Sequence, residues 1–339
     1  MRYGNVAIDA VGYVLPPEVV TSEAMESVFA GTLKRLGLPP GQLEKLSGVR
    51  ERRWWEPNTK PSIVSTMAAE RALARANMRP TDVQVLVNTS VSRDFLEPAT
   101  AAFIGGQLGV GRHCMSFDIT NACLGFLNGM LVAANMIELG QADNALVTCG
   151  ECTREGVQAT LQRLAESHAD VQVFRDNFAS LTLGCGAVAM VLKRRDQSSS
   201  GHVLKGAVYR TASEHNTLCL ASHAEMRSDP HGLLVHGVGL AVQTWPYAAA
   251  ELGWQSPEDI DEFVCHQVSL AHFTHTFQQL ELPLEKALLT FPYLGNVGPA
   301  SLPLTLALGE AQGRIQPGQR LCFFAVGSGL GCIIMGVDW

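Results

Sequence analysis

Residues 80 to 92 read P-T-D-V-Q-V-L-V-N-T-S-V-S, and residues 257 to 269 read P-E-D-I-D-E-F-V-C-H-Q-V-S. The two stretches lie 177 positions apart, and each gives a proline, two polar residues, a β-branched residue and then a strand-like run. A repeat at a fixed spacing is the mark of a fold built from copies of one unit. The sequence therefore predicts a duplicated fold.

The segments around this repeat also recur in the same order. They are an alanine-rich helical segment (61–77 and 240–252), an apolar strand that ends in glycine (145–150 and 321–327) and a closing strand that begins with glycine (186–192 and 331–337). Alternation of apolar strands with helices is typical of parallel sheets covered on both faces. We therefore expect an α/β fold.

The boundary between the two halves is expected at residues 194–201, which read R-R-D-Q-S-S-S-G and are typical of a flexible joint. This gives an N-terminal half, 1–195, and a C-terminal half, 196–339. The stretch 153–179 has no counterpart in the second half, and its apolar positions follow helical spacing. We expect a helical insertion that shapes a binding site.

Composition excludes several classes of protein. The 339 residues are 47% hydrophobic, which is enough for a large core, and the net charge of −7 leaves no basic surface for nucleic acid. No run reaches the roughly 18 apolar residues of a membrane span. The first 15 residues mix polar with apolar positions, which indicates a strand rather than a signal peptide. A cytoplasmic location is expected.

Two patterns resemble redox or metal sites. Cys149 and Cys152 form a C-x-x-C, but no second pair follows, so buried thiols in a reducing compartment are favoured. His266, His272 and His275 form an H-x5-H-x2-H. Because a helix is expected after His266, with the other two histidines on its outer faces, we predict no metal here.

The strand-like run 115–119 leads through three residues to Cys123, and an apolar segment, 124–139, follows and stops at Gly140. A segment that is apolar nearly all round predicts a helix buried in the centre of the protein. The positive end of that helix is expected to stabilise the thiolate of Cys123 and lower its pKa. Cys123 is thus a candidate nucleophile, although its position alone would also suit a small buried residue.

Five motifs resemble those of the ketosynthase III branch of the thiolase superfamily. They are G-V-R-E-R-R at 48–53, N-A-C-L-G-F at 121–126, V-C-H-Q-V-S at 264–269, G-N-V-G-P-A-S-L-P at 295–303 and V-G-S-G-L-G-C at 326–332. Together they span nearly the whole chain in the family's order. The resemblance implies a thiolase-like duplicated fold of five layers, αβαβα, with the active site where the halves meet.

The same resemblance assigns roles to four residues. Cys123 carries an acyl group, since a thiolate is a strong nucleophile. His266 and Asn296 donate hydrogen bonds to the thioester oxygen where negative charge develops, and the backbone N–H groups of Ser328 and Cys123 form an oxyanion hole. Without the motifs, His266 would be a satisfied polar residue at a strand end and Asn296 a turn residue.

Glu97 lies in S-V-S-R-D-F-L-E-P, 90–98, at a position where decarboxylating ketosynthase III enzymes typically carry an aromatic residue. A carboxylate there could remove an α-proton. The stretch resembles that of OleA-type enzymes, which condense two long-chain acyl-CoAs and take this glutamate from the partner subunit of a dimer. On its own, Glu97 would be a surface carboxylate, paired with Arg93.

These features predict a homodimeric acyltransferase of olefin biosynthesis that uses acyl-CoA substrates and no other cofactor. It would perform a non-decarboxylative Claisen condensation and release a β-keto acid. Gln42 stands where some relatives carry a tryptophan, so the residue that would stack on adenine is missing. Ala271 stands where they often carry an arginine that faces acyl carrier protein, which favours coenzyme A over a carrier protein. The alternatives are a decarboxylating 3-oxoacyl synthase that uses a malonyl thioester, and a non-catalytic acyl-binding or redox protein.

Overall fold

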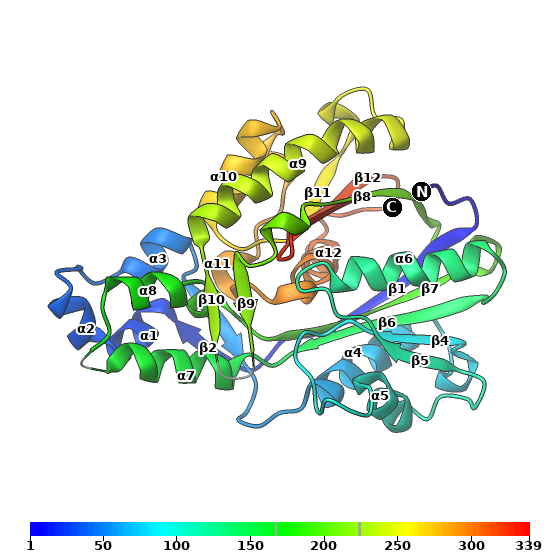
Figure 1. Cartoon of the computed structure of the whole chain (residues 1–339). Helices are drawn as coiled ribbons and strands as arrows, with labels where there is room; N and C mark the ends of the chain where they lie inside the picture. The colour runs from blue at the N-terminus through cyan, green and yellow to red at the C-terminus, as the bar shows by residue number, and fades with distance from the viewer. Residues whose placement is uncertain (167, 223–224) are drawn as a thin grey trace.

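Within residues 1–166, 168–222 and 225–339, which the computed structural model describes, nine strands form one mixed sheet (Figure 1). The strand order is β11 (Glu262–Cys265), β12 (Arg320–Gly327), β13 (Gly331–Asp338), β8 (His202–Thr211), β1 (Val6–Val14), β7 (Gly186–Arg194), β6 (Asn144–Glu151), β4 (Val85–Asn88) and β5 (Met115–Asp118). Only two residue pairs join β1 to β8. The sheet is therefore two half-sheets joined by a short bridge.

The two half-sheets share one topology. β4 runs parallel to β6, and β11 runs parallel to β12. β7 and β13 then follow antiparallel, and β1 and β8 close each half. The predicted duplication is confirmed, but the expectation of parallel sheets is wrong for the closing strands. Residues 328–330 alone connect β12 to β13, and so short a connection can only bring the chain back antiparallel.

Helices lie in three layers around the half-sheets (Figure 1). α4 (Pro61–Arg75) and α5 (Thr100–Leu108) pack on the outer face of the first half, and α9 (Pro230–Leu252) and α10 (Leu270–Gln279) cover the second. Two further helices, α6 (Gly125–Glu138) and α12 (Ser301–Ala311), lie between the half-sheets. Three apolar cores fill the spaces between these layers. The expected five-layer α/β architecture is confirmed.

The central helix α6 is buried because its sequence is apolar on nearly every face, as predicted. Close contact with the first half-sheet depends on Gly129, where an added Cβ would lie 2.6 Å from Thr89 Cγ2 and 3.0 Å from Val147 Cγ1. At the far end, Gly140 adopts a φ of +69° after the helix stops. The start of α6, next to Cys123, thus lies in the middle of the molecule.

The remaining elements surround these layers. They are α1 (Ser22–Val28), α2 (Ala30–Arg35), α3 (Gln42–Ser47), α7 (Arg154–Ala165), α8 (Val171–Asn177), α11 (Phe291–Leu294) and the strands β2 (Glu18–Thr21), β3 (Glu51–Trp54), β9 (Cys219–Ala221) and β10 (Met226–Ser228). α7 and α8 lie within the stretch 153–179 and show the helical character expected there; that this stretch is an insertion stays a prediction. No helix in the described ranges is long and apolar enough to cross a bilayer.

The predicted joint lies between β7 and β8, but it is tied to β1. Asp9 accepts hydrogen bonds from Ser198 Oγ at 2.7 Å and from the backbone N–H of Ser199 at 3.0 Å. The segment is therefore held in place and is not a free linker. The boundary between halves at residue 195 stays a prediction.

Candidate active site

Cys123 lies in the turn between β5 and α6. Ala122, just before it, has a φ of +42°, in a region that L residues rarely adopt. The turn is held by Asn121, whose Nδ2 donates to Asn128 Oδ1 at 2.8 Å, and by the Leu124 N–H, which donates to the Asn121 carbonyl at 2.9 Å. Strain of this kind, held by surrounding bonds, is a common feature of functional sites.

The second half of the molecule meets this turn through the connection between β12 and β13. An added Cβ on Gly327 would lie 2.9 Å from Leu124 Cγ and 3.4 Å from Cys123 Cβ, and one on Gly331 would lie 2.7 Å from Leu124 Cδ1. Only glycine allows the backbone to approach so closely. Ser328 is thereby brought to the cavity that Cys123 lines.

His266 follows directly after β11, and its backbone N–H donates to the Phe324 carbonyl at 2.9 Å. Both ring nitrogens are buried, and neither has a hydrogen-bond partner within the described part of the chain. Burial lowers the pKa of His266 to about 4, so the ring is neutral at pH 7 and offers one N–H donor. A buried, unpartnered imidazole of this kind suits a bound ligand.

Asn296 lies between α11 and the turn that leads to α12, and its side chain is 5% exposed. Its Oδ1 accepts the backbone N–H of Gly298 at 2.9 Å. Because that N–H can only donate, the carbonyl oxygen of the amide must face it, which leaves the Nδ2 hydrogens for the cavity. The backbone N–H of Asn296 donates a hydrogen bond to the Thr182 carbonyl, and its carbonyl accepts one from the Gly184 N–H, so the residue is held in place.

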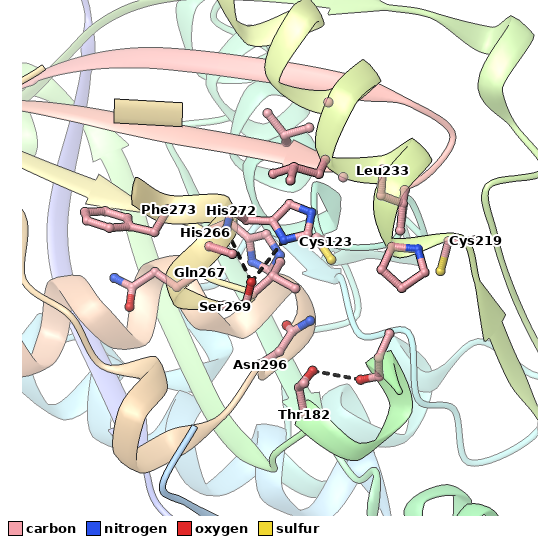
Figure 2. Close-up of a pocket in the computed structure, with 18 of the residues that line it drawn as sticks. Cys123, Thr182, Cys219, Leu233, His266, Gln267, Ser269, His272, Phe273 and Asn296 are labelled. Carbon is pink, nitrogen blue, oxygen red and sulfur yellow. Dashed lines mark hydrogen bonds between the residues drawn. The ribbon is translucent and has the colours of Figure 1, made fainter. Parts of the chain in front are cut away.

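Cys123, His266 and Asn296 line one cavity of about 440 Å³ (Figure 2). Ser328 lines the same cavity. Most of its wall is apolar and comes from α9, α10 and the end of the insertion, including Phe178, Leu233, Leu234, Val238, Phe273 and Phe277. Of the stretch 153–179, Phe178 and Ala179 line this cavity. The geometry suits an extended apolar ligand whose polar end reaches the four residues.

A second cavity, of about 420 Å³, shares Phe178 and His231 with the first. Its wall also includes Gln172, Arg175 and Asp176 of α8. The apolar cavity thus continues toward polar side chains of the insertion.

The expectation of a lowered pKa for Cys123 is wrong for the free protein. Burial raises the pKa of its thiol to about 12, and the nearby charges of Cys219 and Glu151 act in the same direction. The helix end does not offset the loss of water around the sulfur. Cys123 is therefore a neutral thiol at pH 7, next to a neutral His266.

Glu97 is not part of this cavity. It is exposed and lies on the segment 89–99, here called the arm, which connects β4 to α5. The tip of the arm is apolar, with Phe95 55% and Leu96 81% exposed. The alternative of a pair with Arg93 is not observed: Arg93 donates to Thr120 Oγ1 at 2.6 Å, and Glu97 forms no ion pair within the described residues. Within one chain, nucleophile and proposed base are apart.

Three residues of interest were not identified from the sequence. His272 was expected on an outer face of α10, but it lines the cavity, and its Nδ1 lies 3.0 Å from Ser269 Oγ. Cys219 also lines the cavity, from β9. Glu151 is buried at the end of β6, two residues after Cys149. A carboxylate that ends an apolar strand was a visible signal, whereas nothing in the sequence marked Cys219.

Two protein-family models match the chain. Residues 117–210 match 3-oxoacyl-[acyl-carrier-protein] synthase III, and residues 250–339 match the C-terminal part of the same synthase. A curated protein of Xanthomonas campestris, named acyl-CoA:acyl-CoA alkyltransferase, is 39% identical over the full length of both chains. A protein of the same name from Shewanella oneidensis is 37% identical, also over both full lengths.

Solved structures agree with these matches. Cerulenin-bound OleA of Xanthomonas campestris superposes with a TM-score of 0.98, at 39% identity, over 100% of this chain and 98% of that one. A cysteine-to-serine variant of the same protein, with bound lauric acid and lauroyl-CoA, gives 0.97 over 99% of this chain and 100% of that one. The likeness covers both half-sheets and all layers of helices.

The first prediction concerns the ionisation of Cys123. Because the pKa of its thiol is about 12, the thiolate fraction should rise tenfold with each pH unit. Alkylation of Cys123 by iodoacetamide, followed by peptide mass spectrometry, should therefore accelerate about tenfold per unit from pH 7 to pH 9. A rate that levels off below pH 8 would show a stabilised thiolate instead. Cys123→Ser identifies the labelled peptide.

The second prediction concerns the contact between the halves. Gly327→Ala places a methyl group 2.9 Å from Leu124 Cγ and should destabilise the fold by about 1–3 kcal/mol. In a chain of this size that should lower Tm by several degrees in differential scanning calorimetry. Gly239→Ala is the matched control, because an added Cβ there meets nothing within 4 Å. Equal Tm values for the two variants would contradict the close contact.

Proposed function

Because the chain belongs to the acyl-CoA:acyl-CoA alkyltransferase family of the thiolase superfamily, we propose that it condenses two long-chain acyl-CoAs through an acyl group on Cys123. The observation that carries this proposal is the shared apolar cavity of Cys123, His266 and Asn296. An apolar wall suits an alkyl chain, and the polar residues at one end suit a thioester. The product would be a β-keto acid, a precursor of long-chain olefins.

In the first step, the sulfur of Cys123 attacks the thioester carbonyl of one acyl-CoA. A new C–S bond forms on Cys123, the bond to coenzyme A breaks, and the thiol proton leaves with coenzyme A. The backbone N–H groups of Cys123 and Ser328 stabilise the tetrahedral oxyanion. A thiol with a raised pKa supports this order, because its proton has to leave as the acyl group arrives.

In the second step, Glu97 removes an α-proton from the second acyl-CoA. The enolate oxygen is held by the N–H of His266 and by the Nδ2 group of Asn296. The enolate carbon attacks the acyl-cysteine carbonyl, the C–S bond breaks, and the Cys123 sulfur recovers a proton. Water then hydrolyses the 2-alkyl-3-oxoacyl thioester to the β-keto acid and free coenzyme A.

In this proposal, Glu97 reaches the cavity from a second copy of the chain. The exposed apolar residues Phe95 and Leu96 flank it, and large exposed apolar side chains on a loop are typical of a contact surface. β5 lies at the edge of the sheet with Met115 56% exposed, so its backbone is open to another strand. These features support a homodimer in which each arm completes the partner's site.

Nine cysteines without a disulfide support a cytoplasmic location, where thiols stay reduced. The alternative activity is a decarboxylating condensation with a malonyl thioester. The two family models carry the name of such a synthase, but the relatives that match over their full length carry the alkyltransferase name. Turnover with acyl-CoA alone separates the two activities.

The third prediction separates the two half-reactions. Cys123→Ala should abolish acylation and condensation together. Glu97→Ala should still gain one acyl group at Cys123, measured by intact-protein mass spectrometry, but condense about 100- to 10,000-fold more slowly, because the base is lost. Normal condensation by Glu97→Ala would contradict the assignment of the base. If the wild-type protein releases CO₂ from malonyl-CoA and does not turn over acyl-CoA alone, the decarboxylating alternative is correct.

The fourth prediction tests whether Glu97 acts across a dimer. Cys123→Ala and Glu97→Ala chains, co-expressed with different tags, can form hybrids with one complete site each. A statistical mixture should recover about a quarter of the wild-type condensation rate, although each parent is inactive. A mixture as inactive as its parents, with hybrids isolated by both tags, would contradict action in trans.

A further inference from the structure

Three carboxylates hold the arm that carries Glu97. Asp94 accepts hydrogen bonds from the backbone N–H of Ser62 at 2.9 Å and from its hydroxyl at 2.6 Å. Where the arm enters α5, Asp118 accepts the backbone N–H groups of Thr100 and Ala101, both at 2.8 Å. The third carboxylate is Glu151, at the root of the arm.

Glu151 makes the largest number of these contacts. Its Oε1 accepts the backbone N–H of Val91 at 2.6 Å, and its Oε2 accepts the hydroxyl of Ser92 at 2.7 Å and the backbone N–H of Ser92 at 3.2 Å. Ser92 Oγ in turn accepts the N–H of Cys152 at 3.1 Å. The end of β6 and the root of the arm thus form one hydrogen-bonded unit.

The donors around Glu151 favour a carboxylate at this site. Glu151 is only 2% exposed, and burial raises its pKa, although the donors from Ser92 and Val91 oppose that effect. Three hydrogen-bond donors face the two side-chain oxygens of Glu151. A carboxylate can accept all three hydrogen bonds, whereas an amide has only one oxygen that accepts. A buried charge is retained only where hydrogen bonds compensate it.

Glu151 does not touch the ligand cavity, since it is not among the described residues of the wall. It lies behind Asn296: an added Cβ on Gly298, whose N–H binds the Asn296 side chain, would be 3.8 Å from Glu151 Cδ. On the other side it binds the arm. Glu151 therefore stands between the active site of its own chain and the arm that leaves that chain.

We propose that Glu151 is a positioning residue for the general base: it holds the root of the arm so that Glu97 enters the second copy's site in a productive place. The inference rests on the function proposed above for Glu97. Glu151, Asp94 and Asp118 leave only the tip, 95–98, free of such anchors. Because the rest of the arm is already fixed, less conformational entropy is lost when the tip docks, and the carboxylate of Glu97 is placed accurately.

The test is Glu151→Gln, which keeps the size of the side chain but turns a donor toward the N–H groups of Val91 and Ser92. Acylation of Cys123 should be no slower than in the wild type, because loss of the Glu151 charge removes one cause of the raised thiol pKa. The KM for acyl-CoA should match the wild type, whereas kcat for condensation should fall about 10- to 100-fold. Glu151→Asp keeps both oxygens on a shorter stem and should restore part of that kcat. The readouts are intact mass for acylation and product formation for condensation.

Asp9→Asn is the matched control. Asp9 is also buried and also binds a serine hydroxyl and a backbone N–H, those of Ser198 and Ser199, but it lies outside the cavity wall. It pairs with Lys193 as well, so its replacement should destabilise the fold at least as much. Its kcat for condensation should nevertheless stay at the wild-type value. A parallel fall in the control would show that the defect of Glu151→Gln is one of stability, and the inference would be wrong.

Hybrid dimers locate the effect. In the hybrid, the complete site combines Cys123 of the Glu97→Ala chain with the arm of the Cys123→Ala chain. When Glu151→Gln is added to the Cys123→Ala chain, that arm is altered, and the condensation rate should fall. With Glu151→Gln added to the Glu97→Ala chain, the arm is intact and the rate should not change. The reverse result would place the effect at Cys123 and overturn the inference.

The inference also fails if Glu151→Gln condenses at the wild-type rate, or if acylation and condensation fall together. Should that variant not fold, Ser92→Ala decides, because it removes one donor and leaves the carboxylate in place. It should acylate normally and condense a few-fold more slowly, and an unchanged rate would overturn the inference. If the proposed function itself is wrong, the result is different: Glu97→Ala then condenses at the normal rate.

Discussion

The close contact between the start of α6 and the turn between β12 and β13 is the constraint on which the site depends. Gly327 and Gly331 bring the second half against Leu124, and no larger residue fits there. That contact sets Ser328 beside Cys123 and brings His266, from the neighbouring strand β11, to the same cavity. The duplicated halves thus supply different parts of one site, Cys123 from the first and His266, Asn296 and Ser328 from the second.

Burial governs the chemistry of that site. The thiol of Cys123 and the imidazole of His266 are both neutral at pH 7, because each lies where water cannot solvate an ion. In such surroundings a hydrogen bond to a developing negative charge is stronger than it would be in water. The carboxylate of Glu97 stands outside, on an exposed arm, so one chain does not have to bury it beside the thiol. Glu151, which is buried, is used to hold that arm.

Much of this could be predicted from the sequence. The repeat at 80 and 257 gave the two halves, and the motifs around Cys123, His266 and Asn296 gave residues that the fold brings together. Two predictions from the sequence were wrong. Burial raises the pKa of Cys123, although its position before a helix predicted a lowered value, and His272 faces the cavity instead of an outer face of α10. The repeat also could not show that β7 and β13 run antiparallel to their neighbours; for β13 this follows from its short connection to β12. Contacts such as Glu151 with Ser92 join segments 59 residues apart, and they appear only in three dimensions.

The central claim is that Cys123 accepts an acyl group from a coenzyme A thioester. Peptide mass spectrometry of the wild-type protein, quenched shortly after mixing with a long-chain acyl-CoA, tests it most directly. One acyl adduct is expected on the peptide that contains Cys123, formed and lost at rates that match turnover. Product formation without that adduct, or an adduct only on another cysteine such as Cys219, would contradict it.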